Sequence, residues 1–310
     1  MFKELKLYKD ENGASFAIVI FVLFVMLAVG GLVVDMGIVY KTRIEMRKAA
    51  NAAALSGVQE IFNGEAAVNK IVEDILKSHN EKYSKPFIKE NKVTVTLKKN
   101  VPLFFIRIFG IDSTEVEVAS SAKAAPLSAA TGAVPLGVPK NIINNIGDGQ
   151  EYELKVGPGE SEYGNFGIIS LSDTWNIGRD YEHDLTYGYD GEIKEGQILD
   201  TETGNVQGKT INGIAYRFSH SPNTQVGLPS GDIDIKNDTR VLKVIVYEEM
   251  PHKGNQLKEV KVVGFAYFYL KGPYDSDNSN ITGYFIKGLE SGATDGNAVD
   301  KGAYGIRLVE

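Results

Sequence analysis

The chain of 310 residues contains no cysteine, so disulfide bonds, zinc–thiolate centres and thiol nucleophiles are excluded. Its four histidines lack the spacing of metal ligands, and no Gly-x-Ser-x-Gly motif occurs. The four histidines are His79, His183, His220 and His252. The sequence therefore offers no catalytic, cofactor-binding or metal-binding residue, and we expect a protein that is not an enzyme.

A surplus of basic residues is also missing. The chain has 33 Lys and Arg against 40 Asp and Glu, which gives a formal net charge of −7. The acidic excess lies beyond residue 62. Proteins bind nucleic acids chiefly through cationic side chains that neutralise phosphates. The composition thus argues against nucleic acid as a partner.

One segment has no charged residue at all, from Gly13 to Val34. A helix over residues 14–34 would be ~31 Å long, which matches a hydrocarbon core of roughly 30 Å. A secretory signal has a shorter apolar core, followed closely by a cleavage site. The sequence predicts a transmembrane helix over 14–34, preceded by a short N-terminal segment, 1–13. Lys and Arg are too evenly divided between its two sides to fix the orientation.

Beyond this span the helix is expected to continue as a stalk over residues 35–62, which contain no proline and are rich in alanine. Small residues recur on the stalk every four positions, at Ala49, Ala53 and Gly57 and again at Ala50 and Ala54. Such spacing is typical of faces on which two helices approach closely. It predicts packing against a helix of a partner subunit or of a second copy. The high helix propensity of alanine explains the pattern equally well.

Residues 63–125 have the pattern of a small α+β module. Apolar residues at helical spacing over 68–76 predict an amphipathic helix, and alternation at Val93–Leu97 and Val116–Val118 predicts two half-buried strands. The dense apolar run Leu103–Phe109 between these strands is expected in the core. Prolines and small residues over 126–140 then indicate a linker.

Residues 141–310 alternate turn residues with short β-branched and aromatic runs, which predicts an all-β domain of sandwich or barrel type. The expected strands are Phe166–Leu171, Ile214–Phe218, Arg240–Glu248, Glu259–Lys271 and Ile281–Lys287. The fourth is apolar on both faces and should lie at the centre of a sheet. Trp175 would serve core packing or line a carbohydrate site. The predicted fold class is α+β: a single N-terminal transmembrane and stalk helix, a small α+β module and an all-β C-terminal domain.

Four motifs in the first 62 residues are similar to those of a known family. They are Gly13-Ala14, Gly30-Gly31-Leu32-Val33-Val34-Asp35-Met36-Gly37, Val39-Tyr40-Lys41-Thr42-Arg43 and Ala49-Ala50-Asn51-Ala52-Ala53-Ala54-Leu55-Ser56-Gly57. The segment resembles the N-terminal region of TadG-like proteins of Tad (Flp) pilus-assembly systems, of the Gram-positive type. Gly13, Asp35 and Gly37 match the motif, whereas Asn51 replaces the usual aspartate. Prepilin-like members carry glutamate five residues after the processed glycine, where this chain has Ile18.

The resemblance implies a single-pass protein of the cell membrane, with a cytoplasmic N-terminus and an extracellular C-terminal domain. It implies a non-catalytic structural or assembly component of a Tad (Flp)-type pilus or related surface apparatus. The partners would be the membrane and other pilus-assembly or pseudopilin subunits, or further copies joined through the helical stalk. Two other hypotheses stay open: a membrane-tethered adhesive or ligand-binding module and, less favoured, a tethered hydrolase.

Overall fold

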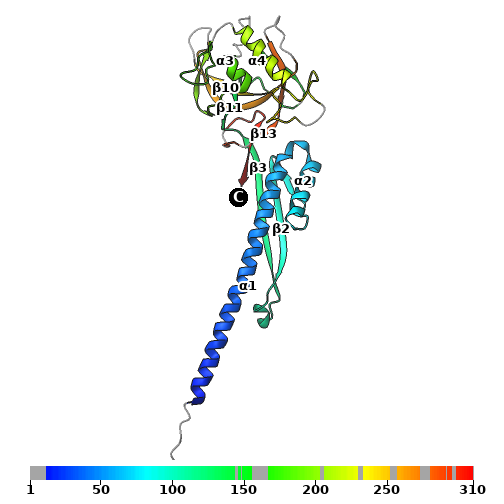
Figure 1. The fold of residues 1–310 in the computed structure, drawn as a ribbon, viewed down its shortest axis with the longest axis vertical. Helices are drawn as coiled ribbons and strands as arrows, with labels where there is room; N and C mark the ends of the chain where they lie inside the picture. Colours follow the sequence, from blue (N-terminus) through cyan, green and yellow to red (C-terminus); the bar gives the residue numbers. More distant parts are fainter. Residues whose placement is uncertain are drawn as a thin grey trace, which may run out of the picture.

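A computed structural model gives the structure of the chain and describes residues 12–143, 146–147, 149–155, 167–202, 206–229, 233–251, 257–272, 280–290, 292–294 and 298–309. A long helix carries a small α+β module along its upper half, and a β-rich head lies above this module (Figure 1). The α+β fold class with a β-rich C-terminal region is therefore confirmed.

The helix α1 runs without a break from Asn12 to Gln59, and its first half stands apart from the folded body (Figure 1). Within the described residues it is the one helix long and apolar enough to cross a membrane. Large apolar side chains are exposed on it from Phe16 to Val34. The helix ends slightly before the predicted end of the stalk, and a short 3-10 helix, η1 (Ile61–Asn63), follows.

The stalk module consists of the upper half of α1, helix α2 (Glu65–Ser78) and a five-stranded sheet of order β1-β2-β3-β14-β13. Its strands are β1 (Phe87–Lys89), β2 (Lys92–Pro102), β3 (Ser113–Pro126), β13 (Gly288–Glu290) and β14 (Ala303–Val309). The predicted apolar stripe over 68–76 is the buried face of α2, and β2 buries alternate residues from Val93. The helix and both strands predicted for this module are confirmed.

The last two strands come from far along the chain. β14 pairs antiparallel with β3, from Tyr304 opposite Pro126 to Val309 opposite Ser121, and β13 pairs in parallel with β14. The stalk module therefore includes residues that the sequence assigned to the C-terminal domain. No local pattern indicates this pairing, because the two partner strands are separated by the whole head.

The head is built on a seven-stranded sheet of order β10-β5-β7-β9-β11-β12-β6, in which β10 also pairs with β11. Its strands are β5 (Ala133–Pro139), β6 (Glu151–Lys155), β7 (Ile168–Ile169), β9 (Ile198–Glu202), β10 (Val241–Glu249), β11 (Glu259–Leu270) and β12 (Asn280–Ile286). The pairing of β10 with β11 closes a ring of strands, as expected for a barrel-like domain. β11 is buried on both faces from Gly264 to Leu270, which confirms its predicted central place.

The stretch 126–140 is not a linker. It contains the end of β3, the short strand β4 (Ala129–Ala130), which pairs with β8 (Ile193–Lys194), and β5, which is buried along almost its whole length. Pro135 fits into β5 because the pairing with β10 shifts register between Ala133 and Gly137. A proline has no N–H to donate, so within sheets it is tolerated at such irregularities.

The segment Ile214–Phe218 is not a strand either. It belongs to helix α4 (Gln207–Ser219), which packs on helix α3 (Tyr181–Tyr187). A Cβ atom at Gly213 would lie 3.1 Å from a methyl group of Leu185, so the glycine lets the two helices approach closely. The head is therefore β-rich but not all-β.

Candidate functional site

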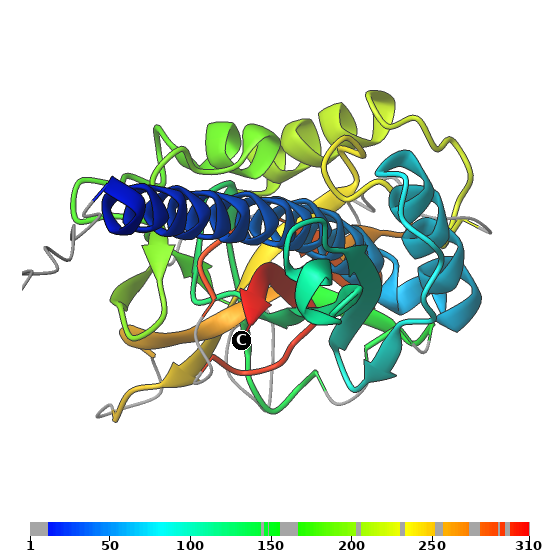
Figure 2. The same cartoon turned by 90° about the horizontal axis from the view of Figure 1, so that it is seen from below.

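The long hairpin of β2 and β3 runs beside α1 and ends in residues 103–111, which we call the hairpin foot (Figure 1). The foot contains the short 3-10 helix η2 (Ile106–Phe109), and the view along the molecule also shows it beside α1 (Figure 2). The expectation that the run Leu103–Phe109 lies in the core is wrong. Leu103 is buried, but the side chains of Phe104, Phe105, Ile108 and Phe109 are exposed.

Asp35 attaches the hairpin foot to α1. Its side chain is fully buried, and its carboxylate accepts hydrogen bonds from three consecutive backbone N–H groups. Phe104 N lies 2.8 Å from Oδ1, while Phe105 N and Ile106 N lie 2.9 and 2.8 Å from Oδ2. The first N–H groups of a helix have no partner within it, so Asp35 caps η2 from a neighbouring element. These donors stabilise the ionised carboxylate where the apolar run of α1 ends.

Gly31 lies one helical turn before Asp35, beneath the ring of Phe105. A Cβ atom at position 31 would come 2.4 Å from Phe105 Cγ and Cδ1, so a side chain there would displace the ring. Gly30 and Gly37, by contrast, have no neighbouring heavy atom within 4 Å of the position of such a Cβ. Of these three glycines, Gly31 is therefore the one packed closely against another side chain, whereas the motif residue Gly37 faces open space.

Above Asp35 the same side of α1 is buried by the stalk module. The predicted packing face has five small residues: Ala49, Ala50, Ala53, Ala54 and Gly57. The four alanines have no exposed surface, and a Cβ atom at Gly57 would lie 2.9 Å from Val72 of α2. The spacing indicates close packing correctly, but the neighbours are α2, β2 and β3 of the same chain. The face is covered, which corrects the prediction that it packs on a partner subunit or a second copy.

The two remaining motif residues also lie on α1. Gly13 falls in the first turn of α1, and Asn51 is half-buried beside the alanines. Sequence reasoning missed the pairing of Gly31 and Asp35 as a seat for the hairpin foot. The signal that could have revealed it is a glycine four positions before an acid at the end of an apolar run, since this spacing places both on one helix face.

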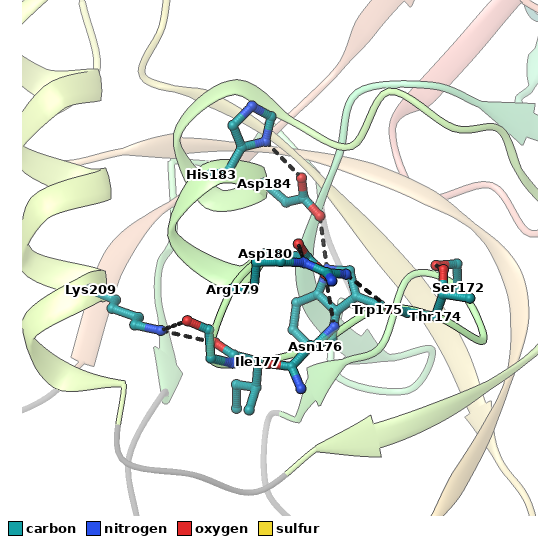
Figure 3. A network of polar contacts seen from close by, with 11 residues as sticks. Ser172, Thr174, Trp175, Asn176, Ile177, Arg179, Asp180, His183, Asp184 and Lys209 are labelled. Carbon is teal, nitrogen blue, oxygen red and sulfur yellow. Dashed lines mark hydrogen bonds and ion pairs between the residues drawn. The ribbon is translucent and has the colours of Figure 1, made fainter.

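The head contains a separate polar network, between the loop at 172–180 and helices α3 and α4 (Figure 3). Trp175 Nε1 donates to Asp184 Oδ2 at 2.8 Å, and the other oxygen of Asp184 lies 3.0 Å from His183 Nδ1. Lys209 of α4 donates to the carbonyl of Ile177 at 3.2 Å. Trp175 is buried, so it packs this loop onto the helices and is not a surface for carbohydrate. Among the described residues, no group of three metal-ligating side chains occurs.

A cleft of about 590 Å³ lies where the end of α1 meets the head. Phe62 of η1 and Glu290 of β13 line one part of it, and Lys236 and Lys287 line another. The volume is within the usual range of small-molecule sites. Its lining mixes charges of both signs, so it indicates no particular ligand.

Comparison with known proteins gives one result. Residues 13–60 match the family model Tad, for Flp pilus-assembly TadE/G-like proteins. Searches of curated proteins and of solved structures give no match. The matched segment coincides with α1, so it includes the seat of the hairpin foot and the covered small-residue face. The chain thus carries the TadE/G-like segment of Flp pilus-assembly proteins at residues 13–60, and the resemblance seen in its N-terminal motifs is confirmed.

Proposed function

We propose that the protein is a membrane-anchored, non-catalytic structural or assembly component of a Tad (Flp)-type pilus or a related surface apparatus. The main support is the match of residues 13–60 to the TadE/G-like family model. The matched helix exposes large apolar side chains along its first half, where the rest of the chain does not bury them. A helix that is apolar all round requires an apolar environment, and residues 14–34 are long enough to span a bilayer. In this proposal α1 crosses the membrane and continues into the stalk module, which holds the head away from the lipid.

For the orientation we propose a cytoplasmic N-terminus and an extracellular head. The family resemblance supports this choice, which the balance of Lys and Arg leaves open. The proposed partners are other pilus-assembly or pseudopilin subunits. Because the face from Ala49 to Gly57 is covered, the surfaces left for them are the exposed half of α1 and the outside of the stalk module and head.

Protease treatment of wall-stripped intact cells tests the membrane topology. We expect epitopes placed beyond residue 126 to be removed while an epitope at residue 5 survives. Full protection of the C-terminal epitopes would contradict the orientation. The assembly role is tested by co-purification from intact membranes, where pilus subunits should accompany the protein. They should be lost when residues 14–30 are replaced by an unrelated membrane helix, a change that keeps the buried half of α1.

The second candidate function is a tethered adhesive or ligand-binding module, and the cleft beside Phe62 is the observation in its favour. Binding of a glycan or peptide by the full-length protein, lost on Lys236→Glu or Lys287→Glu, would support it.

A tethered hydrolase remains the least favoured function. Hydrolysis of peptidoglycan by the purified protein, abolished by one carboxylate substitution, would overturn the non-catalytic part of the proposal.

A further inference from the structure

The hairpin foot presents a cluster of large apolar side chains to its surroundings. Phe104, Phe105, Ile108, Phe109 and Ile111 are between 43% and 79% exposed. They crowd into a single turn and the short helix η2 at the end of a hairpin. Scattered apolar residues are normal on a protein surface, but a contiguous apolar patch marks a contact with another apolar phase.

The position of the foot along α1 indicates which phase this is. Phe105 rests on Gly31, and Asp35 binds the backbone of residues 104–106. The apolar run of α1 ends at Val34, so the two residues that hold the foot lie on either side of that end. Gly31 lies roughly 4.5 Å inside the run, at 1.5 Å of rise per residue. A bilayer that covers the run up to Val34 therefore reaches the foot.

Exposed apolar residues of the helix lie within three positions of Gly31, on which the foot rests. Leu32 and Val34 are exposed large hydrophobics on the same stretch of α1. Arg107 of the foot forms an exposed ion pair at 2.8 Å with Asp112, the residue that follows the foot. Arginine at such a boundary keeps its apolar stem in the hydrocarbon while its guanidinium reaches the lipid headgroups.

We propose that the hairpin foot inserts into the lipid interface on the side of the membrane from which the stalk module rises. Phe104, Ile108 and Phe109 lie among the upper acyl chains, and Arg107 lies at the headgroups. Segments of this kind bind an interface in proportion to the apolar area that they bury. A single spanning helix is free to tilt. A second contact beside it fixes the direction in which the stalk module leaves the bilayer.

This inference rests on the proposed membrane anchoring. Spin labels on single engineered cysteines test the anchor and the insertion of the foot independently. The chain has no native cysteine, so each variant carries one spin label in the full-length protein, reconstituted in nanodiscs of phosphatidylcholine and phosphatidylglycerol. The labelled positions are Phe109→Cys in the foot, Leu27→Cys in the apolar run and Val226→Cys in the head. All three side chains are well exposed, so labelling should leave the fold intact. Collision rates with oxygen, which concentrates in lipid, and with a water-soluble nickel chelate report where each label lies.

We expect the labels at 27 and 109 to collide more with oxygen than with the chelate, and the label at 226 to show the reverse. Lipid-like behaviour at 27 with water-like behaviour at 109 would overturn the insertion of the foot and leave the anchor standing. Water-like behaviour at both would overturn the anchor itself. If the label at 109 is shielded from both reagents, and gains access to the chelate when each disc holds one copy, a second copy covers the foot and the lipid proposal is wrong.

Discussion

The two halves of α1 share one unbroken helix but have opposite surroundings. Residues 15–34 expose their large apolar side chains, whereas Met46, Ala49 and Ala53 are fully buried against α2 and the sheet. A protein core accepts only side chains that fit its shape. Lipid, the proposed surroundings of the first half, requires apolarity but little shape complementarity. The comparison teaches that hydrophobicity alone does not tell these two environments apart, and that substitutions should.

The largest effect is expected from shortening a buried methionine. Met46→Ala should lower the free energy of unfolding by roughly 2–5 kcal/mol, because it leaves a cavity between α1 and the sheet. The matched control is Met26→Ala in the same helix, where the side chain is 69% exposed. This change should stay within about 0.5 kcal/mol. Urea denaturation in detergent micelles, followed by circular dichroism of the sheet, measures both. Equal losses would break the comparison between the halves.

Enlarging a buried alanine should have the next largest effect. Ala53 has no exposed surface, so Ala53→Leu should overpack the stalk module and cost roughly 1–3 kcal/mol. Ala28→Leu in the exposed half should leave the melting temperature unchanged, since leucine and alanine differ little in helix propensity. Differential scanning calorimetry of the two variants beside the parent checks this. A stable Ala53→Leu variant would show that the module is loosely packed at α1.

A more local effect is expected at the boundary between the halves. Asp35→Ala removes the acceptor of three backbone N–H groups, so amide exchange at residues 104–106 should accelerate by about tenfold or more. Asp112→Ala removes the other acid near the foot, which takes part in an exposed ion pair, and should change these rates little. Hydrogen exchange of peptides covering the foot measures the difference. Unchanged exchange in Asp35→Ala would mean that the foot is held by Phe105 alone.

The smallest effect is expected from adding one methyl group to either of two adjacent glycines. Gly30→Ala meets no neighbour and should stabilise the helix by at most about 1 kcal/mol. In Gly31→Ala the same gain is offset, because the new methyl displaces the ring of Phe105. Thermal unfolding of both variants should therefore rank Gly30→Ala above Gly31→Ala. The reverse order would remove the role that we assign to Gly31.

Local patterns predicted much of this fold. The uncharged run identifies α1, helical spacing identifies α2, and alternation identifies β2 and β3. A run that is apolar on both faces identifies the central strand β11. The sequence predicts the wrong surroundings for the hairpin foot. A dense apolar run has the same composition whether it is covered by protein or, as we propose, by lipid. Gly31 and Asp35 share one helix face, but the foot that they hold lies about 70 positions further along the chain. Periodic spacing describes only near neighbours in the sequence, so it does not predict which segment packs on this face.

The remaining errors arise where tertiary contacts override local preference. Pro135 and its small neighbours have linker composition, yet a register shift accommodates the proline inside a buried strand. The start of α4 is rich in residues that disfavour helices, and Gly213 is retained there because it lies against Leu185 of α3. The packing of the small residues on α1 was predicted correctly, but repeated spacing does not reveal whether the neighbour belongs to the same chain.

The pairing of β3 with β14 has a consequence for the order of folding. β3 is synthesised before the head and β14 after it, so the sheet of the stalk module cannot close until the head has followed. Contacts between segments so distant in sequence form slowly, because closing a long loop costs entropy. Until then β3 offers an unpaired edge, the kind of edge to which foreign strands add. The stalk module, which the ribosome begins first, is therefore the last part of the molecule to be completed.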